Sequence, residues 1–170
     1  MVVLCSSVMK GMVTIMNRLE RLRFEVDKLI FKKQAYNARY FISHLYGVSR
    51  FCTLLAIKRG LDAEIAATSG MLHDIYQITA GTTENHAIEG AVVAGKILKA
   101  TKQYNSEEIS IITTAISRHS KKRKIHEPYD ELLKDADVMD HSFCNTAYPV
   151  IEKDLVRYNN LLREFGCTIG

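Results

Sequence analysis

The stretch Gly70-Met71-Leu72-His73-Asp74-Ile75 places an imidazole next to a carboxylate at the end of a small, apolar run of residues. A buried carboxylate is costly unless it is paired or bound to a metal, and a neutral imidazole beside it can bind the same kind of cation. Neighbouring side chains on a helix diverge by roughly 100°, so the pair can hold one ion or reach toward two. His73 and Asp74 therefore form a candidate metal site, whose other ligands must come from other helices.

Length and composition favour one globular domain. The chain has 170 residues, of which 47% are hydrophobic, and its net charge is +4. The basic residues are spread along the chain except for one local run, so bulk charge does not favour nucleic acid as a partner. Four cysteines without a Cys-x-x-Cys pair argue against a zinc ribbon, a thioredoxin-like motif and a disulfide framework. No apolar stretch approaches the ~20 residues of a membrane span. Lys10 interrupts the apolar start, which argues against a secretory signal peptide. We therefore expect a cytoplasmic protein with no membrane contact.

Apolar residues recur at three- and four-residue steps along most of the chain, which predicts amphipathic helices and no strands. The expected helices span residues 15–33, 38–59, 63–76, 86–100, 106–119, 129–143 and 149–165. Asp62 is placed as an N-cap, as is either Asn105 or Ser106. Gly60 is placed as a C-terminal stop and Pro149 as a first helical residue. Residues 77–84 and 120–127 are expected to be loops. The sequence thus predicts a single all-α domain of about six or seven helices over residues 16–170, preceded by a loosely held extension at residues 1–15.

Polar residues that need a partner recur on the apolar faces of these helices. Imidazole and carboxylate without thiolate suit Fe, Mn, Co, Ni or Zn, and disfavour a structural zinc site. The set of such residues is His44, His73, Asp74, His86, His119 and Asp137. If the helices bring these side chains together, they would hold a catalytic cation.

The order and spacing of this set resemble the HD superfamily of metal-dependent phosphohydrolases, over roughly residues 41–141. The resemblance implies that one divalent transition metal is bound by His44, His73, Asp74 and Asp137. Lys134-Asp135-Ala136-Asp137 is similar to the closing helix of the family, in which the second Asp is the ligand, so Asp137 is preferred over Asp135.

Two further motifs resemble members that hold two metal ions, such as symmetrical dinucleoside tetraphosphate hydrolases. They are Asn85-His86-Ala87 and Arg118-His119-Ser120. The resemblance implies that Asp74 bridges the two ions and that His86 and His119 bind the second. The alternatives for these two histidines are a hydrogen bond at a helix end, a phosphate contact, or proton donation to the leaving oxygen. Tyr76 and Gln77 depart from the small residue and lysine that many members have there.

The basic run that follows His119 is either a solvated loop or a surface for the outer phosphates of a substrate. Its candidate phosphate contacts are Arg118, Lys121 and Lys122. Other polar residues are expected to be secondary: Asp135 and Asp140 as caps, partners of Lys134 or supports for the ligands, and His141 as a helix-end residue. The tyrosines nearby, Tyr40 among them, are expected in the core or at the rim.

The function that the sequence favours is hydrolysis of a phosphate ester or anhydride by a metal-activated water, with Asp74, His86 and His119 as catalytic residues. The expected partner is a small phosphorylated molecule, such as a nucleotide or dinucleotide, and a homo-oligomer is left open. The alternatives are a metal- or nucleotide-binding sensor with little turnover and, with less support, an RNA-processing hydrolase.

Overall fold

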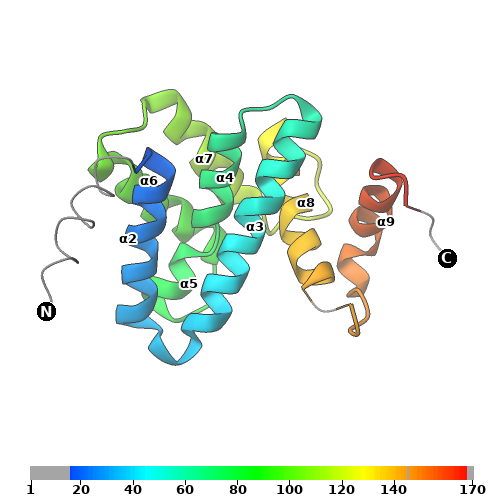
Figure 1. Cartoon of the computed structure of the whole chain (residues 1–170), viewed down its shortest axis with the longest axis horizontal. Helices are drawn as coiled ribbons and strands as arrows, with labels where there is room; N and C mark the ends of the chain where they lie inside the picture. Colours follow the sequence, from blue (N-terminus) through cyan, green and yellow to red (C-terminus); the bar gives the residue numbers. More distant parts are fainter. Residues whose placement is uncertain (1–15, 145, 168–170) are drawn as a thin grey trace, which may run out of the picture.

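The computed structural model describes residues 16–144 and 146–167, and these residues form α-helices, two short 3-10 helices and no strand (Figure 1). The elements are α2 (Arg18–Lys33), η1 (Ala35–Asn37), α3 (Ala38–Arg59), α4 (Ala63–Leu72), α5 (Ile75–Ala80), α6 (His86–Thr101), α7 (Ser106–Arg118), α8 (Pro128–Phe143), η2 (Glu152–Asp154) and α9 (Leu155–Glu164). The predicted all-α class is confirmed. None of the described helices has the length and apolar character that a bilayer crossing requires. The extension predicted for residues 1–15 lies outside the described residues.

Helices α3 and α4 pack closely in the middle of the bundle, as the small residues of α4 predict. A Cβ at Gly70 would lie 2.9 Å from backbone atoms of Ser49, so only glycine permits this approach. The Ser49 hydroxyl donates a hydrogen bond of 3.0 Å to the carbonyl of Ala67, which ties the two helices together. This crossing sets α3 beside the end of α4, where His73 and Asp74 lie.

The helix ends follow local chemistry. Asp62 caps α4 by accepting hydrogen bonds from the amides of Glu64 and Ile65 at 2.8 and 2.9 Å. Asn105 and Glu108 form a capping box at the start of α7. Gly60 ends α3 in the left-handed conformation, at φ 71°. The predicted cap at Asp62 and the stop at Gly60 are therefore confirmed, and of the two residues proposed to cap α7 the structure selects Asn105 over Ser106.

The prediction of one continuous helix over residues 63–76 is wrong, because the helix is interrupted at His73 and Asp74. Helix α4 ends at Leu72, and α5 starts at Ile75 and continues to Ala80, through part of the predicted loop. The His73 ring turns back and its Nδ1 donates a 2.8 Å hydrogen bond to the carbonyl of Gly70, a group that α4 would otherwise leave unpaired at its end. The break divides one expected helix into two, so the described residues hold eight α-helices.

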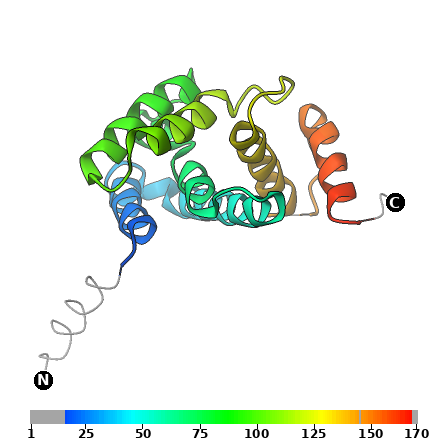
Figure 2. The ribbon, with the colours of Figure 1, turned by 90° about the horizontal axis from the view of Figure 1, so that it is seen from above.

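The last helix also begins later than expected. Pro149 lies in an irregular segment, and α9 starts only at Leu155, after η2. Ile151, expected to point inward, is 50% exposed, so no buried contact supports a helix at that point. Helix α9 lies against α8 at one end of the molecule, far from α2 (Figures 1 and 2).

Candidate metal centre

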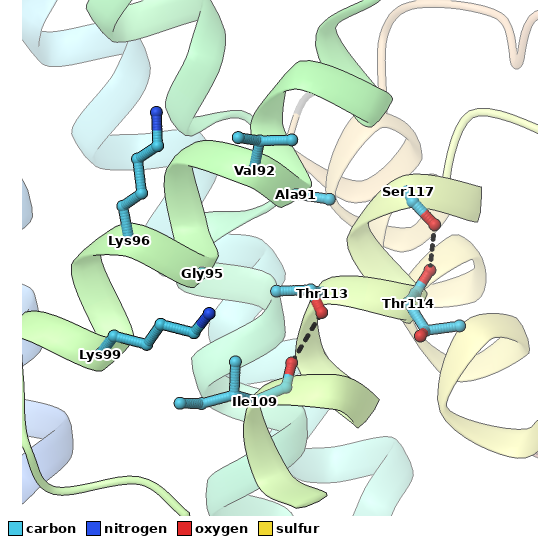
Figure 3. Close-up of a pocket in the computed structure, with 9 residues that line it drawn as sticks. All are labelled: Ala91, Val92, Gly95, Lys96, Lys99, Ile109, Thr113, Thr114 and Ser117. Carbon is cyan, nitrogen blue, oxygen red and sulfur yellow. Dashed lines mark hydrogen bonds between the residues drawn. The ribbon is translucent and has the colours of Figure 1, made fainter. Parts of the chain in front are cut away.

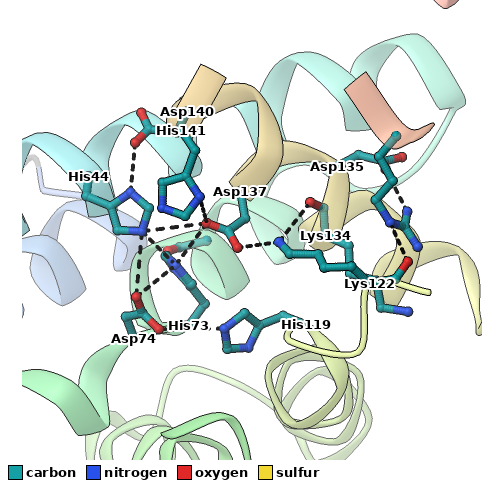
Figure 4. A network of polar contacts seen from close by, with 12 residues as sticks. His44, His73, Asp74, His119, Lys122, Lys134, Asp135, Asp137, Asp140 and His141 are labelled. Carbon is teal, nitrogen blue, oxygen red and sulfur yellow. Dashed lines mark hydrogen bonds and ion pairs between the residues drawn. The ribbon is translucent and has the colours of Figure 1, made fainter. Parts of the chain in front are cut away.

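The structure brings all six predicted side chains together. His44 comes from the first half of α3, His73 and Asp74 from the break between α4 and α5, and Asp137 from the middle of α8. His86 is the first residue of α6, and His119 follows the last residue of α7. Figure 4 shows four of the side chains that point into this centre, His44, His73, Asp74 and Asp137, with His119 beside them. Three helices, the α4–α5 break and the end of α7 thus contribute to one site.

Each of the four imidazoles is held by its Nδ1 atom. The acceptors are a carboxylate oxygen of Asp140 for His44, and main-chain carbonyls of Gly70, Thr83 and Ile116 for His73, His86 and His119. The four hydrogen bonds measure 2.7, 2.8, 2.8 and 2.7 Å in that order. Because these oxygens only accept, each Nδ1 carries its hydrogen, and the Nε2 atoms face the centre.

The Nε2 atoms meet in two pairs. The separation is 3.1 Å between His44 and His73, and 3.2 Å between His86 and His119. Two lone pairs this close repel each other unless a proton or a cation lies between them. Metal–nitrogen bonds are about 2.1 Å long, so two nitrogens at a right angle around one cation are about 3 Å apart. Both pairs have the spacing of neighbouring ligands of a cation.

Asp74 lies between the two pairs. Its Oδ2 is 3.6 Å from His44 Nε2 and 3.5 Å from His73 Nε2. Its Oδ1 is 3.6 Å from the Nε2 atoms of both His86 and His119. One carboxylate thus turns one oxygen toward each imidazole pair, as a ligand bridging two cations would.

Two buried carboxylate oxygens in the centre have no hydrogen-bond partner: Oδ1 of Asp74 and Oδ1 of Asp137. The latter lies 3.7 Å from His44 Nε2 and 3.8 Å from His73 Nε2. An unpaired buried carboxylate oxygen is costly, and a bound cation would remove that cost. The ligand atoms of His44, His73 and Asp137 all lie within 4.8 Å of one another. The same is true of the ligand atoms of His73, Asp74 and His119. The donor set therefore fits a divalent transition metal.

The electrostatics of the centre favour a cation. Burial by itself lowers the pKa of His44, but the hydrogen bond with Asp140 and the charges of Asp74 and Asp137 together raise that pKa to about 10. Burial outweighs the same carboxylates at His73 and lowers its pKa to about 4. In the cation-free protein, the His44 Nε2–H can therefore donate to the neutral His73 Nε2, and an incoming cation must displace that proton.

Both central carboxylates remain ionised despite their burial. Burial by itself raises the pKa of Asp74, but His73, His119 and His44 together hold it far below its ordinary value. Burial likewise raises the pKa of Asp137, and the charges of Lys122 and of nearby imidazoles outweigh it and lower that pKa. The centre therefore offers two anionic ligands over the whole physiological pH range.

Supporting residues surround these ligands. Asp140, three residues after Asp137 and so on the same face of α8, orients the His44 ring as anticipated for a support. His141 lies in the last turn of α8, as predicted, but it also contacts the centre. Its ring stacks on that of His44 with centroids 4.9 Å apart, and its Nδ1 lies 3.7 Å from Asp137 Oδ1. Tyr40, 58% exposed at the rim, also stacks on His44.

The loop between α7 and α8, residues 119–127, is only partly the exposed loop that the sequence predicts. Lys122 turns inward with 8% of its side chain exposed, and its Nζ contacts Asp137 Oδ2 (Figure 4). Arg118 pairs with Asp130 at 2.8 Å, and Lys121 is exposed. Charge density alone does not reveal which cation of a basic run turns inward. Of these cations it is Lys122 that turns inward, and its ammonium pairs with the ionised Asp137.

A shallow groove between α6 and α7 lies away from the centre (Figure 3). It is lined by Gly95 and Thr113 at the helix contact, with Lys96 and Lys99 on the α6 side. Gly95 is nine residues from His86, which is about 180° around a helix. The groove therefore faces the opposite side of α6 from the imidazole.

Comparison with known proteins agrees with this geometry. Residues 41–142, more than half of the chain, match the family described as HD domain, and this range contains all six side chains of the centre. The chain belongs to the HD domain family. HD domains as a class are metal-dependent phosphohydrolases, so the predicted resemblance is confirmed at the level of the superfamily. Helices α2 and α9 lie outside the matched part of the HD domain.

A protein named Ribonuclease Y, from Chlorobium phaeovibrioides (strain DSM 265 / 1930), is 30% identical to this chain over 98 residues. These residues are 58% of this chain and 17% of that protein. The chain therefore spans less than a fifth of the length of this relative. No solved structure matches the chain significantly.

Proposed function

We propose that this HD domain binds two divalent transition metal ions and hydrolyses a phosphate ester or anhydride in a small phosphorylated substrate, such as a nucleotide or dinucleotide. The observation that carries the proposal is the position of Asp74. Its two oxygens face two pairs of imidazole nitrogens at 3.5 to 3.6 Å, and Oδ1 has no other partner. His44, His73, Asp74 and Asp137 would hold one ion, and Asp74, His86 and His119 the other.

The ions would supply acidification of water near neutral pH and neutralisation of phosphate charge. The chain's own residues prepare the site for this chemistry. Four Nδ1 hydrogen bonds fix the imidazoles, so little side-chain entropy remains to be lost when ligands bind. Because the Nε2 atoms of His86 and His119 both face Asp74, we assign them to the second ion rather than to proton donation.

Lys122 is the best-placed residue for a phosphate oxygen. Its ammonium lies at the edge of the centre, on the Asp137 oxygen that faces away from the imidazoles. Arg118 contributes less directly in the present arrangement, because its guanidinium is engaged by Asp130. Lys121 is free to approach from solvent. We therefore rank Lys122 first among the three proposed phosphate contacts.

The test is a hydrolysis assay with nucleoside mono-, di- and triphosphates and dinucleoside polyphosphates, each with Mn²⁺, Co²⁺ or Fe²⁺. We expect a product with at least one substrate, and loss of that activity in Asp74→Asn. Binding of a nucleotide and of metal without any product would favour the sensor alternative. Absence of both metal binding and product would refute the proposal.

A second candidate function is cleavage of RNA, which the match to a protein named Ribonuclease Y favours. The chain covers 17% of that protein, so the rest of the relative is not represented in the match. A short single-stranded RNA with a 5′ label, incubated with the same metals, separates the two candidates. Cleavage that depends on Asp74, together with RNA binding that weakens as salt rises, would support the RNA substrate.

A further inference from the structure

Lys122 reaches the centre from a segment without regular structure. Its Nζ contacts Asp137 and lies 3.3 Å from the carbonyl of Lys134. A lysine side chain has four rotatable methylenes and loses much entropy when its end is fixed. The ammonium can stay beside Asp137 only if the main chain of Lys122 is held in place, because residues 119–127 have no helix of their own to do so.

Arg157, in α9, holds that main chain. Its Nε donates a 2.8 Å hydrogen bond to the carbonyl of Lys122. Its two terminal nitrogens donate at 2.7 Å to Asp135 Oδ1 and to Glu131 Oε2. Asp135 and Glu131 are one turn apart on α8, so they fix the guanidinium against the helix that carries Asp137. One planar side chain thus joins the Lys122 segment to α8.

A second anchor holds the segment two residues further on. The ammonium of Lys134, which is fully buried, donates 2.8 Å to the carbonyl of Lys124 and 2.7 Å to His126 Nδ1. It also pairs at 2.6 Å with Glu131, the carboxylate that Arg157 shares. Lys134 therefore fixes the far part of the segment, whereas Arg157 acts at Lys122 itself.

We propose that Arg157 is a positioning residue for the reaction, and that it makes α9 part of the active site. By fixing the carbonyl of Lys122 it keeps the Lys122 ammonium beside Asp137, where that charge receives a phosphate oxygen of the substrate. The inference rests on the proposed function. It extends the site beyond the matched HD domain, because α9 begins thirteen residues after that range ends at residue 142.

Arg59 provides a matched control. It also links α8 to the C-terminal segment, through Asp135 at 2.9 Å and Glu164 at 2.7 Å, but its side-chain hydrogen bonds go to these two carboxylates and not to the Lys122 segment. Arg59→Gln and Arg157→Gln therefore remove similar ion pairs from one network, and only the second frees the carbonyl of Lys122. Arg157→Lys retains the charge but not the three-way fork of the guanidinium.

The experiment measures the Kd for inorganic phosphate, by calorimetry on the full chain loaded with Mn²⁺. We expect Lys122→Met and Arg157→Gln each to weaken phosphate binding about tenfold, the effect of losing one charge-assisted hydrogen bond. The double variant should bind no more weakly than Lys122→Met alone, because Arg157 acts through Lys122. Arg157→Lys should recover little, and Arg59→Gln should bind phosphate as the wild type does.

Hydrogen exchange at residues 121–125 provides a readout independent of metal and substrate. Those amides should exchange faster in Arg157→Gln than in Arg59→Gln at equal thermal stability. Equal phosphate Kd values for these two variants, or additive losses in the double variant, would overturn the inference while leaving the proposed function intact. A wild-type protein that binds neither Mn²⁺ nor phosphate would overturn both.

Discussion

The substitution Asp74→Asn tests the metal centre most directly. Asparagine has nearly the shape of aspartate, so the packing around residue 74 should persist, but the amide lacks the negative charge and one of the two acceptor oxygens. Asp74 is within 3.6 Å of all four Nε2 atoms, which means that one substitution affects both imidazole pairs. We expect loss of both cations from a protein that still folds.

The size of the effect follows from linkage between binding and folding. A ligand present at 100 times its Kd stabilises the folded state by about 2.7 kcal/mol. For a chain of this length, 1 kcal/mol shifts the Tm by about 2–4 °C, so saturating Mn²⁺ should raise the wild-type Tm by roughly 5–11 °C. Asp74→Asn should show almost none of this rise. The comparison is the shift caused by Mn²⁺, because the substitution also changes the stability of the cation-free protein.

The assay is thermal unfolding after treatment with a chelator, with and without added Mn²⁺, Co²⁺ or Zn²⁺, followed by elemental analysis of the desalted protein. Asp27→Asn is the matched control. Asp27 in α2 also has a buried carboxylate oxygen without a partner, but its other oxygen accepts from the Tyr46 hydroxyl and no imidazole pair faces it. A wild-type Tm that no metal raises, or an equal rise in Asp74→Asn, would refute the assignment of the centre.

Three further outcomes are expected. His86→Ala should reduce the bound metal from two ions to one per chain by elemental analysis, and two remaining ions would contradict the second site. The cation-free protein should lose stability as pH rises from about 6.5 to about 10. The pKa of His44 is raised to about 10 in the folded state, so over this range the folded protein holds a proton that the unfolded chain has released. Urea unfolding at pH 6.5, 8 and 9.5 measures this slope, which His44→Gln should flatten. Gly70→Ala should destabilise the protein by about 1–3 kcal/mol, because a Cβ there meets the backbone of Ser49 at 2.9 Å. Gly95→Ala is the control and should not destabilise the protein in this way, because a Cβ there meets only a Thr113 methyl at 3.4 Å.

Much of the fold could be predicted from the sequence because its signals are local. The three- and four-residue spacing of apolar side chains identifies the helices, and a cap such as Asp62 acts on amides two and three residues away. The break at His73 was not predictable in this way. It depends on a side chain that forms a hydrogen bond to Gly70 while its other nitrogen faces a residue from α3.

The same distinction applies to the metal centre: its ligands could be predicted from the sequence, but some of the contacts around them could not. Residue type and order, together with the resemblance to the HD superfamily that favoured Asp137 over Asp135, selected all six side chains that the structure brings together: His44, His73, Asp74, His86, His119 and Asp137. The spacing of Asp140 and His141 after Asp137 contained a signal for two supporting residues, since positions three and four apart share a helix face. Nothing in that spacing indicated that the His141 ring stacks on His44, which comes from another helix.

The sequence by itself determined the helical class, the caps and the kinds of ligand, because each depends on residue chemistry and on spacings of a few positions. Only the tertiary structure decided that Lys122, one cation among five in a basic run, turns inward to Asp137, and that Arg157 holds it there. These contacts join residues 15 and 35 positions apart. The packing of the whole bundle determines the point at which a loop crosses a distant helix. The short-range periodicity of the sequence contains no information about that point.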